Sequence, residues 1–341
     1  MKVLVTGHQG YIGTVMVPML LDAGFDVVGL DSNLYRYCTY GDEPLAVPTI
    51  QKDVRDVTAT DLEGIDAVVH LAALSNDPLG NINPNLTYDI NHLASVQIAK
   101  AAKQAGTQRF VFASSCSMYG KAGDDVLDES ATFNPVTAYA KSKVLVEQEV
   151  SAMADDNFSP TFMRNATAYG VSPRMRFDLV INNLVAWAMT TGKILMKSDG
   201  TPWRPLVHIE DISLAVICAL NAPRDVAHNL AVNVGTNTEN YQMRDLAQMV
   251  KDTVPNCDIE YAEGASPDER CYRVNFDKIR DVFPDFKPRW TALKGVEQCY
   301  ESYNRYGLNA DDYEGIKFKR IAHIKHLIAE GKLTDELRWT I

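Results

Sequence analysis

The fold class is decided by residues 2–13, which read Lys2-Val3-Leu4-Val5-Thr6-Gly7-His8-Gln9-Gly10-Tyr11-Ile12-Gly13. The first five are a short apolar run rich in β-forming residues, typical of a buried strand. Three glycines follow at regular spacing, and apolar residues then recur at helical spacing until Gly24. A second apolar run, residues 25–31, ends in an aspartate. The stretch therefore predicts strand, glycine turn, helix and strand, the opening of a parallel α/β sheet.

The glycine turn predicts a dinucleotide site. Glycines let the backbone turn tightly and approach a pyrophosphate, and the helix N-terminus offers free amides and about half a positive charge. Asp31 can accept hydrogen bonds from an adenosine ribose and would repel a 2′-phosphate, which favours NAD over NADP. Arg36 lies close enough in sequence to keep NADP as a minor alternative.

Two later segments extend this prediction. Asp53 either caps the adenine amino group or serves as a turn aspartate. Residues 67–73, Ala-Val-Val-His-Leu-Ala-Ala, predict a buried strand whose small terminal residues allow a cofactor to lie against the backbone. His70 within it is expected to be a packed strand histidine. Residues 85–105 predict a helix ended by Gly106.

A second pair of segments carries the candidate chemistry. Ser114-Ser115-Cys116-Ser117-Met118-Tyr119 follows an apolar run that predicts another buried strand. Tyr139 and Lys143 are four residues apart in a helical segment, so they share one face. A phenol titrates near ~10, so a base at neutral pH needs roughly three units of help, of which a neighbouring lysine cation supplies part. The alternative is an ordinary helix with a packed tyrosine and a solvated lysine.

Length and composition restrict the function classes. The 341 residues suffice for one large α/β domain or two modest ones. A net charge of −11 disfavours nucleic-acid and membrane-surface partners. Six cysteines without a C-x-x-C pattern indicate reduced thiols, no zinc site and a cytoplasmic location. No apolar run reaches membrane-spanning length, and a strand that starts at residue 2 is expected to leave no room for a signal peptide.

Taken together, these motifs resemble the extended short-chain dehydrogenases, and more narrowly the NAD-dependent sugar-nucleotide epimerase/dehydratase group. The likeness runs in order over roughly residues 1–300. It is carried by residues 6–13, Asp31, residues 53–55, residues 70–73, Asn91, residues 114–120 and residues 139–143. The resemblance implies an α/β Rossmann fold, a doubly wound parallel sheet with a smaller C-terminal α/β substrate-binding lobe.

The resemblance also implies a site. Ser115, Tyr139 and Lys143 would be catalytic, NAD the cofactor and a nucleotide-diphospho-sugar the substrate, with no metal. Cofactor contacts are expected from Gly7, Gly10, Tyr11, Ile12, Gly13, Asp31, Asp53, Val54, Leu71, Ala72, Ala73, Ser114, Tyr139, Lys143 and Asn165. Substrate contacts are expected from Ser75, Ser117, Thr167, Asn183, Arg204 and Arg270.

The domain organisation follows the same likeness. Residues 1–170 are expected to form the NAD-binding domain, residues 171–307 mostly a substrate lobe interleaved with it, and residues 308–341 a helical tail. The tail helix would have an apolar side made of Ile316, Ile321, Ile324, Leu327 and Ile328; the sequence assigns the tail no function. The helices carrying Asn91 and Tyr139 resemble a four-helix dimer interface, so a homodimer is expected.

The expected reaction begins with the Tyr139 phenolate, which takes a sugar hydroxyl proton while hydride passes to NAD⁺ and a keto-sugar forms. An epimerase returns the hydride to the other face. A 4,6-dehydratase of this family has Asp-Glu directly after the catalytic hydroxyl residue, where this chain has Cys116 and Ser117. Cys116 either relays a proton or is a small packed thiol. The leading hypothesis is therefore an epimerase; the alternatives are a keto-sugar reductase or dehydrogenase, and a non-catalytic dinucleotide sensor.

Overall fold

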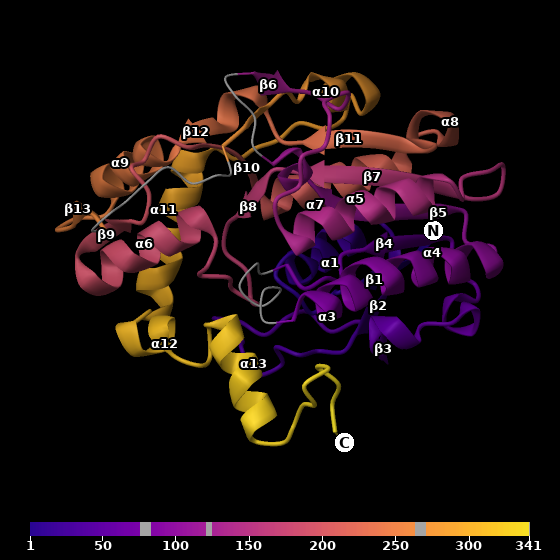
Figure 1. Cartoon of the computed structure of the whole chain (residues 1–341), viewed down its shortest axis with the longest axis horizontal. Helices are drawn as coiled ribbons and strands as arrows, with labels where there is room; N and C mark the ends of the chain where they lie inside the picture. Colours follow the sequence, from indigo (N-terminus) through magenta and orange to yellow (C-terminus); the bar gives the residue numbers. More distant parts are fainter. Residues whose placement is uncertain (76–82, 121–124, 263–270, 341) are drawn as a thin grey trace.

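The large sheet organises the molecule. The structure, a computed structural model, describes residues 1–75, 83–120, 125–262 and 271–340 (Figure 1). Seven parallel strands lie in the order β11-β7-β5-β4-β1-β2-β3. Their bounds are β1 Lys2–Thr6, β2 Asp26–Asp31, β3 Thr49–Gln51, β4 Ala67–His70, β5 Arg109–Ser115, β7 Ser159–Asn165 and β11 Leu230–Val234. This order, reversing next to β1, confirms the predicted doubly wound Rossmann fold.

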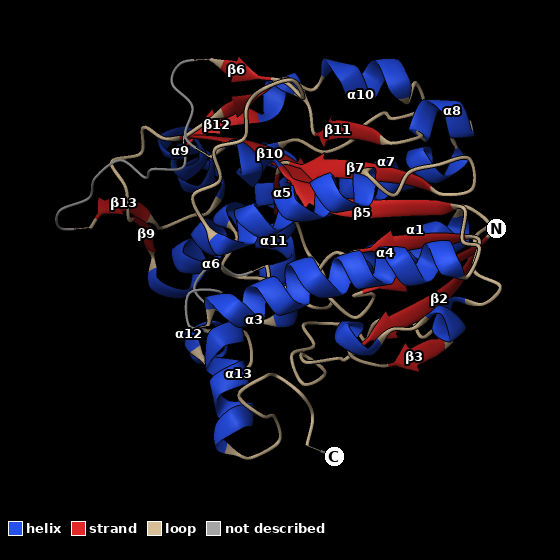
Figure 2. Ribbon diagram, turned by 45° about the vertical axis from the view of Figure 1, so that its right-hand side comes forward, coloured by secondary structure: helices blue, strands red, loops and turns tan. Residues whose placement is uncertain are grey.

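Helices cover both faces of this sheet. Within β1, Val3 and Val5 face one apolar cluster and Leu4 faces the other, because successive strand residues point to opposite faces. One face packs against α1 (Gly13–Asp22), α7 (Ile209–Asn221) and α10 (Asp277–Val282). The other packs against α3 (Pro84–Tyr88), a π-helical turn (Asp89–Leu93), α4 (Ala94–Gln104) and α5 (Ala138–Ser151) (Figure 2). Burial on both sides explains why these strands read as continuous apolar runs.

A second group of elements follows β7 in the chain. β8 (Thr167–Tyr169), β10 (Trp203–His208) and β12 (Asn240–Gln242) form a small sheet, and β9 (Lys193–Met196) pairs with β13 (Asp258–Tyr261). Their apolar core includes side chains of α6 (Val180–Thr191), α9 (Met243–Thr253) and α11 (Ala292–Tyr306). β14 (Arg273–Val274) pairs with β6 (Val126–Leu127), which precedes β7 in the chain, and α8 (Arg224–Ala227) lies against β7. β11 and α7 return to the large sheet, so the division at residue 170 stays a prediction.

Several segments differ in detail from the sequence-based prediction. The strand expected over residues 67–73 ends at His70, and the next three residues leave the sheet. His70 itself is packed as expected, with Nδ1 2.6 Å from Thr6 Oγ1 and Nε2 2.8 Å from Ser95 Oγ. The predicted helix over residues 85–105 is α3, the π-helical turn and α4 in succession, and it starts where Asn83 accepts a hydrogen bond from the Leu86 amide.

The tail returns to the large sheet. After α12 (Ala310–Glu314), the helix α13 (Arg320–Ala329) buries Ile324 and Leu327 against the core of the sheet. Ile316 does not belong to this apolar side: it precedes the helix and is 50% exposed, which corrects the prediction. Figure 1 shows α13 and the C-terminus beyond β2 and β3. Among the described residues, none of the helices combines the length and the apolar character needed to cross a membrane.

Candidate active site

A groove opens at the carboxyl ends of β1, β2 and β4. It encloses about 950 Å³ of empty space, part of it open to solvent. Of the predicted cofactor residues, its walls contain Gly7, Gly10, Tyr11, Ile12, Gly13, Asp31, Asp53, Val54, Leu71, Ala72 and Ala73. The carboxyl edge of such a sheet, at the point where strand order reverses, is where ligands of this fold class bind.

The glycine turn forms the floor of the groove. Gly7 has a φ of +74°, and a Cβ there would lie 2.8 Å from the Ala72 amide nitrogen. A Cβ on Gly13 would lie 2.4 Å from the Gly7 carbonyl oxygen. Neither Gly7 nor Gly13 therefore has room for a side chain. The Thr14 amide at the start of α1 donates to the Gly10 carbonyl at 3.1 Å, so the N–H groups that this turn can offer to a dinucleotide pyrophosphate are those of residues 11–13.

Asp31 lies at the end of β2 beside this turn. Its carboxylate accepts hydrogen bonds from the amides of Gln9 (2.9 Å) and Asn33 (2.7 Å). Burial raises the pKa of Asp31, and the two amide hydrogen bonds oppose that shift. Arg36, which kept NADP open, stacks on Trp339 at 3.8 Å from the ring centre and does not occur among the described residues that line the groove.

Asp53 is a turn aspartate that also lines the groove, and its contact with an adenine stays a prediction. Its side chain caps a short 3₁₀ turn, accepting from the Arg55 amide at 2.9 Å, and it pairs with the Arg55 guanidinium at 2.6 Å. Burial opposes ionisation, but the Arg55 contacts lower the pKa of Asp53 overall. The turn-aspartate alternative therefore describes its bonding, while the same residue also lines the groove beside Val54.

The three predicted catalytic residues meet at the carboxyl end of β5. Ser115 ends the strand, and its Oγ accepts a hydrogen bond from the Ser117 amide at 3.1 Å. Tyr139 lies in the first turn of α5. Lys143 donates from Nζ to the carbonyl of Ala113 at 2.7 Å, and this nitrogen lies 5.5 Å from the centre of the Tyr139 ring. The alternative of a solvated lysine is wrong, because Lys143 is only 2% exposed.

Burial also sets the proton affinity of Lys143. Desolvation lowers its pKa to about 7, and the charge of Glu147 one turn further along α5 opposes the shift. A lysine with this pKa is only partly protonated at neutral pH. Any negative charge that develops on the neighbouring phenol would favour the ammonium form, so the two groups are expected to titrate as a coupled pair.

Two buried polar atoms beside the catalytic residues lack a partner within the described part of the chain. Asn165 donates from Nδ2 to the carbonyl of Ser114 at 3.5 Å, but its Oδ1 accepts no hydrogen bond there. The Ser117 hydroxyl is likewise buried and unpartnered there. Buried polar atoms are normally hydrogen-bonded, so these two are suited to contact a bound ligand.

Cys116 fits the packed-thiol alternative. It is fully buried, and its Sγ donates to the carbonyl of Arg164 at 3.0 Å. Burial raises the pKa of the thiol well above its ordinary value. A thiol with this environment has neither the exposure nor the acidity that a proton relay requires.

The predicted substrate residues do not all line the groove. Ser75 lines the groove, where its Oγ and carbonyl accept from Arg176 at 2.8 and 3.1 Å. Asn183 uses both amide hydrogens inside the protein, donating to the Phe177 carbonyl at 2.8 Å and the Tyr313 hydroxyl at 2.7 Å. Both amide hydrogens of Asn183 are therefore used within the protein, and its contact with a diphosphate stays a prediction.

Two further predicted substrate residues, Thr167 and Arg204, do not line the groove. Thr167 is half-buried in β8, and Arg204 is buried in β10 with a hydrogen bond from Nη1 to the Trp203 carbonyl at 2.9 Å. Arg270 lies outside the described residues. Sequence reasoning missed Arg176, Arg320 and Leu337, which line the groove from distant parts of the chain. No local pattern around them indicates a site.

The fold and site define a class: a Rossmann protein with a dinucleotide groove and a serine, tyrosine and lysine at the end of the fifth strand of its sheet. Residues 3–235 match the NAD dependent epimerase/dehydratase family, and the chain belongs to that family of extended short-chain dehydrogenases. It is therefore an enzyme of the sugar-nucleotide epimerase/dehydratase type, and its cofactor is NAD.

Curated relatives include both reaction types. A UDP-glucose 4-epimerase of Lactobacillus helveticus is 30% identical over 77% of this chain and 84% of the relative. A dTDP-D-glucose 4,6-dehydratase of Mus musculus is 25% identical over 89% of each chain. Among solved structures, MoeE5 in complex with UDP-glucuronic acid and NAD is 26% identical, covers 89% of this chain and 99% of its own, and superposes with a TM-score of 0.77.

Proposed function

We propose that this enzyme is an epimerase that acts on a nucleotide-diphospho-sugar by transient oxidation to a keto-sugar. The observation that carries the proposal is the buried Lys143 beside Tyr139, fixed by the Ala113 carbonyl at the end of β5. Relatives that bind or act on UDP-sugars and dTDP-sugars support the substrate class.

Each residue of the site has a different role in the proposed reaction, which follows from its position. NAD, when bound, supplies reversible two-electron oxidation of the sugar alcohol. Tyr139 takes the proton of that hydroxyl and returns it in the reverse step. The Ser115 hydroxyl is placed to hold the same oxygen. Lys143 stabilises the phenolate, because its charge lies close to the ring in a site from which water is largely excluded.

The two positions after Ser115 favour epimerisation over dehydration. Elimination of water from the sugar needs an acid and a base besides the tyrosine. Cys116 is buried with a raised pKa, and the Ser117 hydroxyl is a far weaker acid than a carboxyl group. Neither group can replace a carboxyl pair, so the keto-sugar would be reduced again rather than dehydrated.

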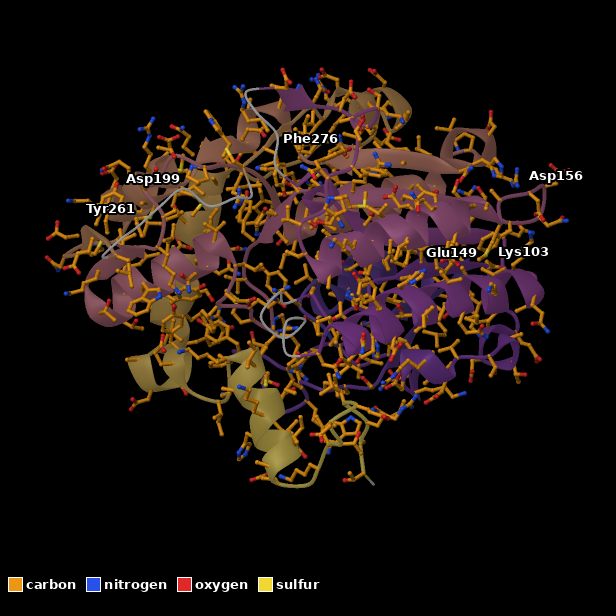
Figure 3. The ribbon with its side chains drawn as sticks, viewed as in Figure 1. Lys103, Glu149, Asp156, Asp199, Tyr261 and Phe276 are labelled. Atoms are coloured by element: carbon orange, nitrogen blue, oxygen red, sulfur yellow. The ribbon has the colours of Figure 1, made fainter. Side chains whose placement is uncertain are left out.

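A Tyr139→Phe variant tests the proposal. It removes the proton acceptor and should lower turnover by about 10²–10⁴-fold on the sugar nucleotide that the wild type epimerises. Bound NAD should be unchanged. Substrates would be a panel of UDP- and dTDP-hexoses, with products identified by mass spectrometry and NMR. Tyr261→Phe is the matched control, because this tyrosine is 54% exposed at the periphery of the molecule (Figure 3).

The outcomes separate the alternatives. Net NADH formation in proportion to substrate would favour a dehydrogenase with an exchanging cofactor and overturn the epimerase. A 4-keto-6-deoxy product would show dehydration. A Tyr139→Phe variant with full function would favour a non-catalytic dinucleotide sensor.

A further inference from the structure

The end of the chain contributes to the wall of the cofactor groove. We define the tail segment as residues 320–340, which comprise α13 and the turn that follows it. Arg320, the first residue of α13, and Leu337, in that turn, both line the same groove as the glycine turn and Asp31. The sequence assigns no function to this segment, and the family match ends at residue 235.

Among the described residues Arg320 makes no ion pair at hydrogen-bond distance, although the charge of Asp178 acts on it. Its guanidinium lies 4.1 Å from the centre of the Tyr35 ring, and Nη2 is 3.5 Å from the Arg174 carbonyl. Within the described residues no carboxylate pairs with it, whereas the neighbouring Arg176 is paired with Asp178 at 2.7 Å. Burial lowers the pKa of Arg320, and the charge of Asp178 opposes this shift. An anion in the groove would compensate it.

The turn after α13 is fastened to the loops that follow β2 and β3. Trp339 donates from Nε1 to the Ser32 carbonyl at 2.6 Å, and Arg338 pairs with Asp56 at 2.5 Å. Leu337 between these contacts is 3% exposed and packs in the apolar cluster that contains Val54. The anchors therefore sit next to Asp31 and Asp53, the side of the groove suited to an adenosine.

We propose that the tail segment is part of the NAD site. The turn around Leu337 closes the adenosine side of the groove, and Arg320 faces the dinucleotide phosphates as a cation additional to the glycine turn. This proposal rests on NAD occupying the groove and is independent of which sugar is converted. It accounts for how the enzyme retains its cofactor, which catalysis without net redox change requires.

The charge of Arg320 is tested by Arg320→Gln, with Lys325→Gln as the matched control. Lys325 is exposed on the same helix, so the control removes one positive charge without touching the groove. NAD affinity of the apo protein, measured by calorimetry, should fall about tenfold for Arg320→Gln, the effect of losing one charge-assisted contact. It should not change for Lys325→Gln. Circular dichroism checks that both variants fold.

The closing turn is tested by truncation after Gly331 and by Trp339→Ala. Both should release NAD about tenfold faster and bind AMP more weakly, with unchanged affinity for nicotinamide mononucleotide. NAD should also slow proteolysis within the wild-type tail. If the truncated chain does not fold, Trp339→Ala and the proteolysis measurement test whether the turn contributes to NAD binding.

Three results would overturn the proposal. If the variants bind and release NAD as the wild type does, the tail segment does not contribute to the NAD site. Loss of affinity in Arg320→Gln for NADP alone would place the guanidinium at the 2′-position instead. A wild type that binds no NAD would overturn the cofactor assignment itself, a failure distinct from the first two.

Discussion

At the scale of single residues, the environment of Lys143 is the feature that turns a common pattern into a candidate site. A tyrosine and a lysine four residues apart occur on many ordinary helices. Here the lysine is buried, hydrogen-bonded to the Ala113 carbonyl and in contact with the aromatic faces of Phe112 and Tyr139. An ammonium held in this way loses hydration and, among the described residues, has no counter-ion at hydrogen-bond distance. This arrangement costs stability and is typical of functional sites.

The cost predicts a pH-dependent effect of Lys143→Met on stability. The pKa of Lys143 is lowered to about 7 when folded, against 10.5 in the unfolded chain. Below pH 7 both states hold the proton and the burial penalty is fully present; above it the unfolded chain holds more protons, so wild-type stability rises with pH. The Met variant should be inactive. Its free energy of unfolding relative to wild type should fall by about 2–3 kcal/mol between pH 6 and pH 9.

Urea unfolding at both pH values measures this difference. Lys141→Met is the control, because Lys141 is exposed on the same helix and should show no such change. A constant difference between Lys143→Met and wild type across this pH range would contradict the lowered pKa.

At the scale of elements, α5 is joined to the sheet by a buried ion pair. Glu147 accepts from the Arg164 guanidinium of β7 at 2.8 Å, and Arg164 also donates to the Tyr119 hydroxyl at 3.1 Å. Burial disfavours the charge of Arg164, but the contacts with Glu147 and Tyr119 raise its pKa overall. This pair therefore fixes the helix that carries Tyr139 and Lys143 relative to β5 and β7.

Glu147→Leu should destabilise the protein by about 3–5 kcal/mol, since it leaves the Arg164 charge buried without a partner. The double variant Glu147→Leu/Arg164→Met should be less destabilised than the single one, because both charges are then removed. Urea unfolding at pH 7.5 compares the three proteins. If the free energy of unfolding of Glu147→Leu lay within 1 kcal/mol of wild type, the Arg164 charge would not depend on Glu147, because water or a shifted side chain would already solvate it.

At the scale of the whole molecule, the helical layer of α3, the π-helical turn, α4 and α5 is the surface that matters for assembly. The helices lie side by side, and His92 is 2.6 Å from Glu149 across them. Figure 3 shows Glu149 on this layer. Leu93 beside His92 is 56% exposed on this layer. The expected homodimer would cover it.

The wild type should therefore be a dimer by light scattering, and Leu93→Asp should shift it towards monomer. The aspartate would place an unpaired charge in an apolar contact, which is unfavourable and should weaken the affinity of a dimer of ordinary interface size. Leu45→Asp is the control, as Leu45 is 52% exposed in a loop away from this layer. A monomeric wild type would contradict the prediction.

Much of the fold followed from the sequence because its determinants are local. The glycine turn, the acid at the end of β2 and the alternation of buried residues along β1 are all readable within a few residues of one another. The same holds for Tyr139 and Lys143 on one face of α5. Boundaries were less well predicted: β4 stops at His70 because the small residues after it leave the sheet to line the groove.

The tertiary structure alone decided which distant groups share an environment. Nothing near Asn183 shows that Tyr313 consumes one of its donors, and nothing near Arg320 or Leu337 shows that they face the glycine turn. The burial that lowers the pKa of Lys143 is likewise a property of the packed helix and strand. The physical reason is that periodicity and turn chemistry act over a few residues, whereas desolvation, hydrogen-bond satisfaction and the walls of a groove depend on neighbours that only folding brings together.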